Sequence, residues 1–234
     1  MYAGSSVAFN GSSTELISGS MGTSPGQSIT GNYQLGSGTI ERDTPVARKC
    51  SVDRFNSYIA LSIAQCRKVS KTGDLSGLTF TAGVYCTEGS NSLFTAPSSV
   101  MTIDGLNNPN SLWIFQSGST LTIGKLSTVK LMNRALEENV FWKVDTTAVL
   151  GQRSIFAGNL MAFDSIIVGQ GAVMVGRMLA KKSIKFAGGS AVSLPLSATS
   201  RTPTMRPTKR GDSVSPTQAP TTAKVAMLSV AQVT

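Results

Sequence analysis

Residues 154–171 read SIFAGNLMAFDSIIVGQG, and residues 172–189 repeat the same order of residue classes as AVMVGRMLAKKSIKFAGG. The identical pairs are Gly158 and Gly176, Ala162 and Ala180, Ser165 and Ser183, Ile166 and Ile184, and Gly171 and Gly189. Most other positions exchange one apolar residue for another. A short repeat of strand-length pieces and glycine corners indicates a coiled β-solenoid, in which equivalent residues stack into ladders.

A coil of this length can enclose a triangle. At ~3.3 Å per residue its perimeter is at most about 60 Å, which suffices for three short strands. The segments WIFQSGSTLTIG and VFWKVDTTAVLG, which end at Gly124 and Gly151, also match, with an offset of 27 residues. This offset is one coil plus an excursion, which we place near residues 133–139. The pattern therefore predicts strands from Leu75 to Pro195, and an all-β fold.

The sequence before these coils has patterns that predict short strands followed by one helix. Alternating apolar and polar residues indicate strands from about Ala3 to Ile40. Thr44 followed by Pro45 is typical of a helix start, and a stop at Gly73 gives a helix over about 45–70. One side of this helix is apolar at three- and four-residue spacing, and we expect it to pack on the rest of the protein: Val52, Phe55, Ile59, Ile63 and Cys66. The opposite side is expected to face solvent: Arg48, Lys49, Arg54 and Lys68.

Charge and composition argue against several classes of function. The chain has no histidine, which removes the commonest general base and transition-metal ligand, so we expect no metal and no cofactor. The acids that could serve catalysis are scattered by the repeat: Glu137, Glu138, Asp145 and Asp164. The net charge is +9, but no basic stripe with interleaved aromatics predicts nucleic-acid binding. No stretch reaches the ~18 apolar residues of a membrane span.

Two further features concern the cysteines and the C-terminal part. Cys50 and Cys66 would lie about 24 Å apart on the expected helix and should not form a disulfide. Two arrangements remain open: a bridge from Cys86 to one of them, or three free thiols.

Residues 1–195 form the expected solenoid domain. Residues 196–234, rich in Ser, Thr and Pro and carrying +4 of the net charge, are expected to be a disordered tail.

Alternation along the coils assigns the outward side chains. In SIFAG, AVMVG and SAVSL the larger residues Phe156, Met174 and Val192 point inward, and QSITG and STVKLM fit the same frame. The resulting first face is small, flat and uncharged except at Lys130. Its expected members are Ser28, Thr30, Thr128, Ile155, Ala157, Val173, Val175, Ala191 and Ser193. Because soluble proteins usually place Lys and Glu on such strands, a bare ladder indicates an interaction surface.

A second face competes with the first. Its outward residues come from STLTI, TTAVL, DSIIV and KSIKF. They are Thr120, Thr122, Thr147, Val149, Ser165, Ile167, Ser183 and Lys185. For either ladder the simpler interpretation is ordinary sheet surface or packing against the helix, although one helix can cover only one face.

Several ordered motifs give the chain a family resemblance. SGSMGTSPGQSITGNYQL, LSGLTFTAGVYC, PNSLWIFQSGSTLTIG, NVFWKV, FAGNLMAFDSI, VGRMLA and SIKFAGGSAVSLP together resemble the DUF3494 ice-binding proteins, from Ala3 to Pro195. The resemblance implies a right-handed discontinuous β-solenoid with a long helix alongside, a secreted monomer, and ice binding by the first face. It implies thermal hysteresis and inhibition of ice recrystallisation.

The chain departs from the family pattern in two respects. It lacks the signal peptide and the residues that usually precede AGSSV, so we expect a processed chain or an incomplete gene model. Several ladder positions hold Ile or Val where threonine is frequent, and Lys130 intrudes, so the expected activity is moderate.

Two other functions for a β-solenoid are left open by the sequence. A polysaccharide-cleaving enzyme would need converging acidic and basic residues on one groove. An adhesion or glycan-binding module would favour aromatic platforms, but Trp113 and Trp142 alternate in strands and are expected to pack inside. The sequon Asn10-Gly11-Ser12 fits glycosylation in a secretory route.

Overall fold

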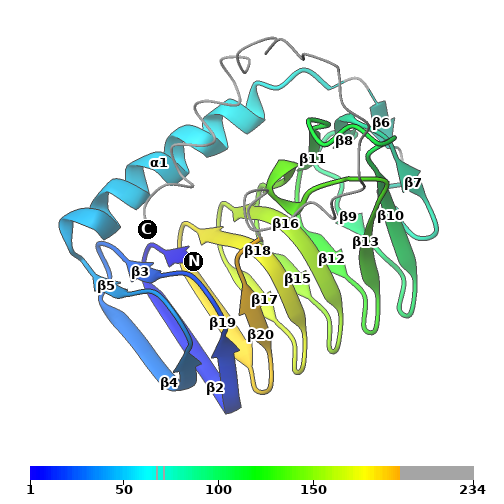
Figure 1. Ribbon diagram of the computed structural model, residues 1–234. Coiled ribbons are helices and arrows are strands. Elements are labelled where there is room, and N and C mark those ends of the chain that lie inside the picture. The colour runs from blue at the N-terminus through cyan, green and yellow to red at the C-terminus, as the bar shows by residue number, and fades with distance from the viewer. Residues whose placement is uncertain (67, 71, 196–234) are drawn as a thin grey trace, which may run out of the picture.

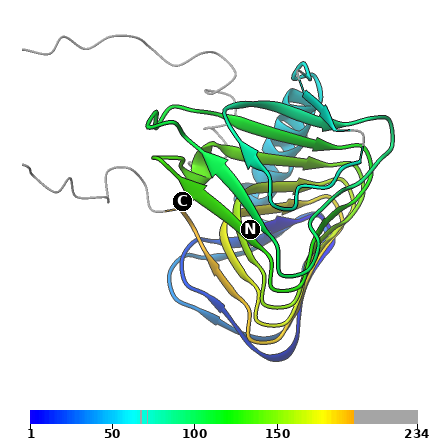
Figure 2. The same cartoon turned by 90° about the vertical axis from the view of Figure 1, so that its right-hand side faces the viewer.

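The computed structural model describes residues 1–66, 68–70 and 72–195. The chain winds into a β-solenoid of triangular cross-section, with parallel strands stacked along each face (Figure 2). One helix, α1 (Pro45–Ser62), lies along the solenoid (Figure 1). The prediction of an all-β solenoid with a helix alongside is confirmed. The expected tail, residues 196–234, lies outside the described residues.

Each face is a ladder of hydrogen-bonded parallel strands. The first face contains β7 (Thr79–Phe80), β10 (Val100–Asp104), β13 (Thr128–Met132) and β20 (Ala191–Ser193). It also contains the first halves of β16 (Ile155–Ala162) and β18 (Val173–Ala180) and the ends of β2 (Ser6–Leu16) and β4 (Ser28–Leu35).

The second face contains β9 (Leu93–Phe94), β12 (Leu121–Ile123), β15 (Ala148–Leu150), β17 (Ile166–Val168), β19 (Ser183–Ala187), and the first halves of β2 and β4. The face under α1, here called the helix face, contains β6 (Lys68–Ser70), β8 (Gly83–Thr87), β11 (Trp113–Ser117), β14 (Val140–Val144), the second halves of β16 and β18, β1 (Tyr2–Ala3), β3 (Met21–Thr23) and β5 (Ile40–Arg42).

The coils do not stack in chain order. β1 inserts between β18 and β3, and β2 pairs with β19 and β20, so the N-terminal coils follow the last coils in space. Helix α1 then carries the chain to the far end of the stack, where β6 and β7 begin the return (Figure 1). The expected excursion is confirmed: a short 3₁₀ helix, Glu137–Asn139, lies between β13 and β14. The offset of 27 residues is also confirmed, since Leu121 pairs with Ala148.

Stacked aromatic rings fill the centre of the solenoid. The ring of Phe115 stacks on Trp142 at 4.2 Å between centroids and on Tyr85 at 5.2 Å. Trp113 and Trp142 are both fully buried, as the alternation predicts. Their indole nitrogens donate to the carbonyl oxygens of Phe80 and Ala157, at 3.0 and 3.1 Å, so burial leaves no polar group unpaired there.

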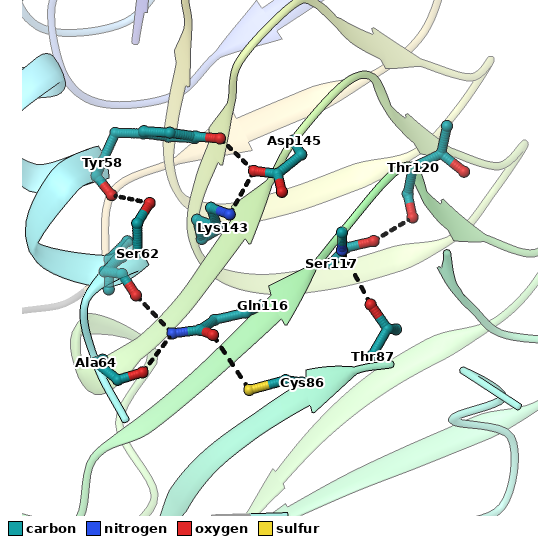
Figure 3. Close-up of polar contacts among 12 residues, drawn as sticks. Tyr58, Ser62, Ala64, Cys86, Thr87, Gln116, Ser117, Thr120, Lys143 and Asp145 are labelled. Atoms are coloured by element: carbon teal, nitrogen blue, oxygen red, sulfur yellow. Dashed lines mark hydrogen bonds and ion pairs between the residues drawn. The ribbon is translucent and has the colours of Figure 1, made fainter. Parts of the chain in front are cut away.

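The start of α1 matches the sequence prediction and its end does not. The Thr44 hydroxyl accepts a hydrogen bond from the Ala47 amide at 3.3 Å, as an N-cap does. The helix ends at Ser62 rather than near residue 70, and Lys68 already begins β6. The side-chain amide of Gln116 donates to the carbonyl oxygens of Leu61 and Ala64, at 2.6 and 2.9 Å (Figure 3). These bonds satisfy carbonyls at the helix end, where no further turn continues.

A disulfide between Cys66 and Cys86, with a Cα–Cα distance of 6.0 Å, joins the segment after α1 to β8. Of the two arrangements that the sequence left open, the bridge is therefore the one present. The expectation that Cys50 and Cys66 do not pair is confirmed. Cys50 is a free, half-buried thiol, and desolvation by burial raises its pKa.

The side of α1 that packs on the solenoid was predicted wrongly. Val52, Phe55, Ile59 and Ile63 are exposed, and the buried helix residues are instead Ala47, Arg54, Ser57 and Leu61. The helix face already presents bulky side chains, which form a cluster with Leu61: Tyr2, Ile114, Phe141, Met161 and Leu179. Two of the four buried helix residues, Ala47 and Ser57, are small and can approach such a surface closely.

Arg54 was also placed wrongly, because it was expected to face solvent. Its side chain is buried against the helix face, and desolvation lowers its pKa. The long aliphatic stem of an arginine explains how such a residue can fill a packed position.

The position of α1 leads to a first prediction, with two neighbouring helix residues as a matched pair. Leu61→Ala should lower the free energy of unfolding by about 3 kcal/mol, because it opens a cavity in a closed cluster. Ile59→Ala should change it by less than about 1 kcal/mol, because Ile59 makes no comparable contact with the solenoid. Urea unfolding of both variants measures the difference. A larger effect at Ile59 than at Leu61 would show that the solenoid packs against the opposite side of the helix.

Candidate functional site

The first face brings together most of the residues that the sequence assigned to it. Hydrogen-bonded register aligns one outward row, which comprises Val100, Thr128, Ile155, Val173 and Ala191. A second outward row aligns Ala157, Val175 and Ser193. Ile155 and Val173 are 47% and 37% exposed, so the centre of the face is apolar and open to solvent. Ala157 is only 5% exposed and belongs to the core cluster, so its register position is on this face but its side chain is buried.

Ser28 and Thr30 do not belong to the first face. Ser28 pairs with Ser6 and Thr30 with Ala8, and through β19 both continue the second face. The alternation in QSITG was correct, since Ile29 packs on the core, but alternation alone does not say which face a strand occupies. The positions that continue the first face are Glu15 and Gln34, so this ladder ends in charged and polar side chains.

Sequence reasoning missed further members of the first face, among them Val100 and Thr102 in β10. They pair with Thr128 and Lys130 in β13, and Val100 is 46% exposed. The signal was present, because SSVMTIDG alternates like STVKLM and lies 28 residues before it in register. Val100 lengthens the uncharged row by one coil, whereas Thr102 lies beyond the charged Lys130.

The second face carries a row of hydroxyls beside a mixed row. The hydroxyl row aligns Ser183, Ser6 and Ser28, and the oxygen atoms of Ser165 and Ser183 lie 2.9 Å apart. The mixed row comprises Phe94, Thr122, Val149, Ile167, Lys185, Ala8 and Thr30. Lys185 stands inside this row, between Ile167 and Ala8, and is exposed. A charged, exposed side chain therefore interrupts the second face near its centre.

Neither ladder is covered by α1, because the helix contacts the third side of the triangle (Figure 2). Packing against the helix is therefore excluded as the explanation of either face. The first face has a continuous uncharged centre, and Lys130 and Glu15 lie toward its two ends.

Two of the four acidic residues that might have served catalysis, Asp145 and Asp164, have structural partners. The carboxylate of Asp145 accepts a hydrogen bond from the Tyr58 hydroxyl and pairs with the ammonium group of Lys143 (Figure 3). Asp164 pairs with Lys182 at 2.7 Å. The first of these contacts ties α1 to β14. An aromatic glycan platform cannot come from the tryptophans, because both are inside the core.

Comparison with known proteins identifies the family. A family model described as Ice-binding-like matches residues 1–189. The chain belongs to this family. An ice-binding protein from Nostoc sp. (strain HG1) is 37% identical over 183 residues, which are 77% of this chain and 65% of that protein. The chain thus spans about two thirds of the length of this relative.

Solved structures of ice-binding proteins have the same fold. The crystal structure of an ice-binding protein from an Antarctic biological consortium has a TM-score of 0.76 and 32% identity, covering 83% of this chain and 86% of that one. The structure from the Antarctic ascomycete Antarctomyces psychrotrophicus has a TM-score of 0.75 and 29% identity, covering 82% and 91%. Among the described residues, no helix is long and apolar enough to cross a membrane.

Proposed function

We propose that this protein binds the surface of ice crystals through its first face. The observation that carries the proposal is an open, uncharged ladder whose register aligns Thr128, Ile155, Val173 and Ala191 across consecutive strands. The ice-binding proteins among its relatives support the same function. We propose that ice binding requires neither enzymatic activity nor a cofactor.

The geometry of stacked strands suits a lattice of water. Strands lie about 4.8 Å apart, and outward side chains along one strand repeat at about 6.6 to 6.8 Å. Methyl groups such as those of Val173 and Val175 would order the adjacent water, and the hydroxyls of Thr128 and Ser193 would anchor it by hydrogen bonds. Recognition then depends on the spacing of the rows and not on a charge or a pocket.

Rigidity is what makes these rows effective. Strands β16 and β18 pair continuously over eight residues, from Ile155 with Val173 to Ala162 with Ala180. Below them Phe156 and Met174 are fully buried in the core. Side chains held in this way lose little conformational freedom when they contact ice, so more of the contact energy appears as binding.

Adsorbed protein would pin a growing ice front between the occupied positions. We therefore propose thermal hysteresis and inhibition of recrystallisation as the activities. Both should be moderate, because Ile155, Val173 and Val175 offer no hydroxyl, and Lys130 and Glu15 limit the length of the uncharged ladder. We propose action outside the cell as a monomer, and the Cys66–Cys86 disulfide fits an oxidising compartment.

The test is direct observation of one ice crystal held just below its melting point in the purified protein. Binding should produce a faceted crystal that stops growing over a measurable temperature gap, and the gap should widen with protein concentration. Rounded crystals that grow freely at high concentration would show that the protein does not bind ice. A heat-unfolded sample of the same chain controls for effects of solutes.

A further inference from the structure

Helix α1 exposes a stripe of large apolar side chains on the side that faces away from the solenoid. The stripe consists of Val52, Phe55, Ile59 and Ile63, which are 58%, 54%, 44% and 78% exposed. Spacings of three and four residues place them on one side of the helix, over about 16 Å of its length. Single exposed apolar residues are ordinary on protein surfaces, whereas an aligned group of this size indicates a contact surface.

The described chain leaves the solenoid close to this helix. The Leu194 amide donates to the Ser18 hydroxyl at 2.9 Å, which fixes the segment after β20. Leu194 also lines a cavity of about 320 Å³ together with Val46, Ala47 and Cys50 in the first turns of α1. The described chain therefore ends, at Pro195, beside the N-terminal part of the helix. Along the helix, the far end of the stripe at Ile63 lies about 26 Å from Val46.

The sequence that follows contains one segment in which apolar residues predominate. Residues 196–222 hold the prolines of this region and most of its charge, whereas Ala223–Val233 reads AKVAMLSVAQV with Lys224 as its single charge. The 27 residues from 196 to 222 could extend to about 90 Å. The segment can therefore reach any part of the stripe without a taut connection.

We propose that the stripe on α1 is a binding site for segment Ala223–Val233 of the same chain. The contact is apolar on both sides and buries Phe55 and Ile59 under Val, Met and Leu side chains of the segment. Attachment to the same chain gives the segment an effective concentration in the millimolar range, well above that of a second copy at micromolar protein. Because α1 covers the helix face, this contact leaves the first and second faces open.

Hydrogen exchange measured by mass spectrometry on the full chain tests the proposal. The amides of residues 223–233 should exchange about tenfold more slowly than those of residues 211–222, which corresponds to a bound fraction of ~90%. The double variant Met227→Asp, Leu228→Asp should remove this slowing. Phe55→Ser with Ile59→Ser should remove it equally, because both residues lie on the exposed side of α1 and not in the core.

The same experiment includes two matched control variants and has an outcome that would contradict the proposal. Val214→Asp, outside the segment, and Ile167→Ser, an exposed apolar residue on the second face, should leave the slowing unchanged. Fast exchange of residues 223–233 in the unmodified chain would overturn the proposal. A dimer in sedimentation experiments would also overturn the proposal if the helix variant Phe55→Ser with Ile59→Ser dissociated it and the variant Met227→Asp, Leu228→Asp did not. The stripe would then join two copies of the chain.

Discussion

Ile155→Tyr should abolish most of the thermal hysteresis of this protein and leave its fold intact. Ile155 lies at the centre of the first face, between Thr128 and Val173 in register, and is 47% exposed. A tyrosine ring there would stand above the neighbouring rows and hold several coils away from the ice lattice. A loss of ~1.4 kcal/mol or more in contact energy lowers affinity about tenfold. The measurement is the hysteresis gap as a function of concentration.

Ile167→Tyr is the matched control for this variant. Ile167 is the same residue type, lies at the centre of the mixed row on the second face and is 41% exposed. Its substitution should leave the hysteresis gap near that of the unmodified protein, and both variants should unfold at nearly the same temperature. The reverse result, with activity lost only at Ile167, would assign ice binding to the second face.

The coil repeat predicted much of the architecture because the repeat is itself the register of the structure. The identical pairs Gly158 and Gly176, Ala162 and Ala180, and Ile166 and Ile184 are cross-strand partners. Reading alternation within one coil therefore also aligned its neighbours, and it placed Thr128, Ile155, Val173 and Ala191 in one row. Prediction succeeded here because each contact lies one coil away in the chain.

Prediction failed where contacts join distant parts of the chain. The N-terminal coils stack on the last coils, so the face on which Ser28 and Thr30 lie depends on β19, which follows them by about 150 residues. Alternation could not supply that pairing.

The docked side of α1 was misassigned for a related reason. The contact depends on the size of its partner, and the bulky residues of the helix face accept Ala47 and Ser57 more readily than Phe55. The apolar pattern of the helix alone contains no information about that surface.

The second large effect concerns a glycine of the repeat, Gly176. Its backbone has a φ of +142°, and a Cβ added there would lie 1.9 Å from the carbonyl oxygen of Gly158 in the adjacent coil. That oxygen belongs to the backbone of a packed strand and cannot move aside. Gly176→Ala should therefore lower the free energy of unfolding by at least about 4 kcal/mol, which is a fall of about 10 °C or more in Tm.

Gly171→Ala separates steric contact from backbone conformation. Gly171 also has a positive φ, +65°, but its added Cβ would approach only Cγ of the Arg153 side chain, at 3.4 Å. The expected loss is about 1 to 2 kcal/mol, the cost of a left-handed conformation for alanine. Thermal unfolding of both variants gives the comparison. Equal losses in the two variants would mean that close stacking at Gly176 adds nothing to stability. We expect instead a larger loss for Gly176→Ala, together with a smaller hysteresis gap, because Val175 of the first face adjoins Gly176. That result would show that the flatness of the first face depends on the spacing of its coils.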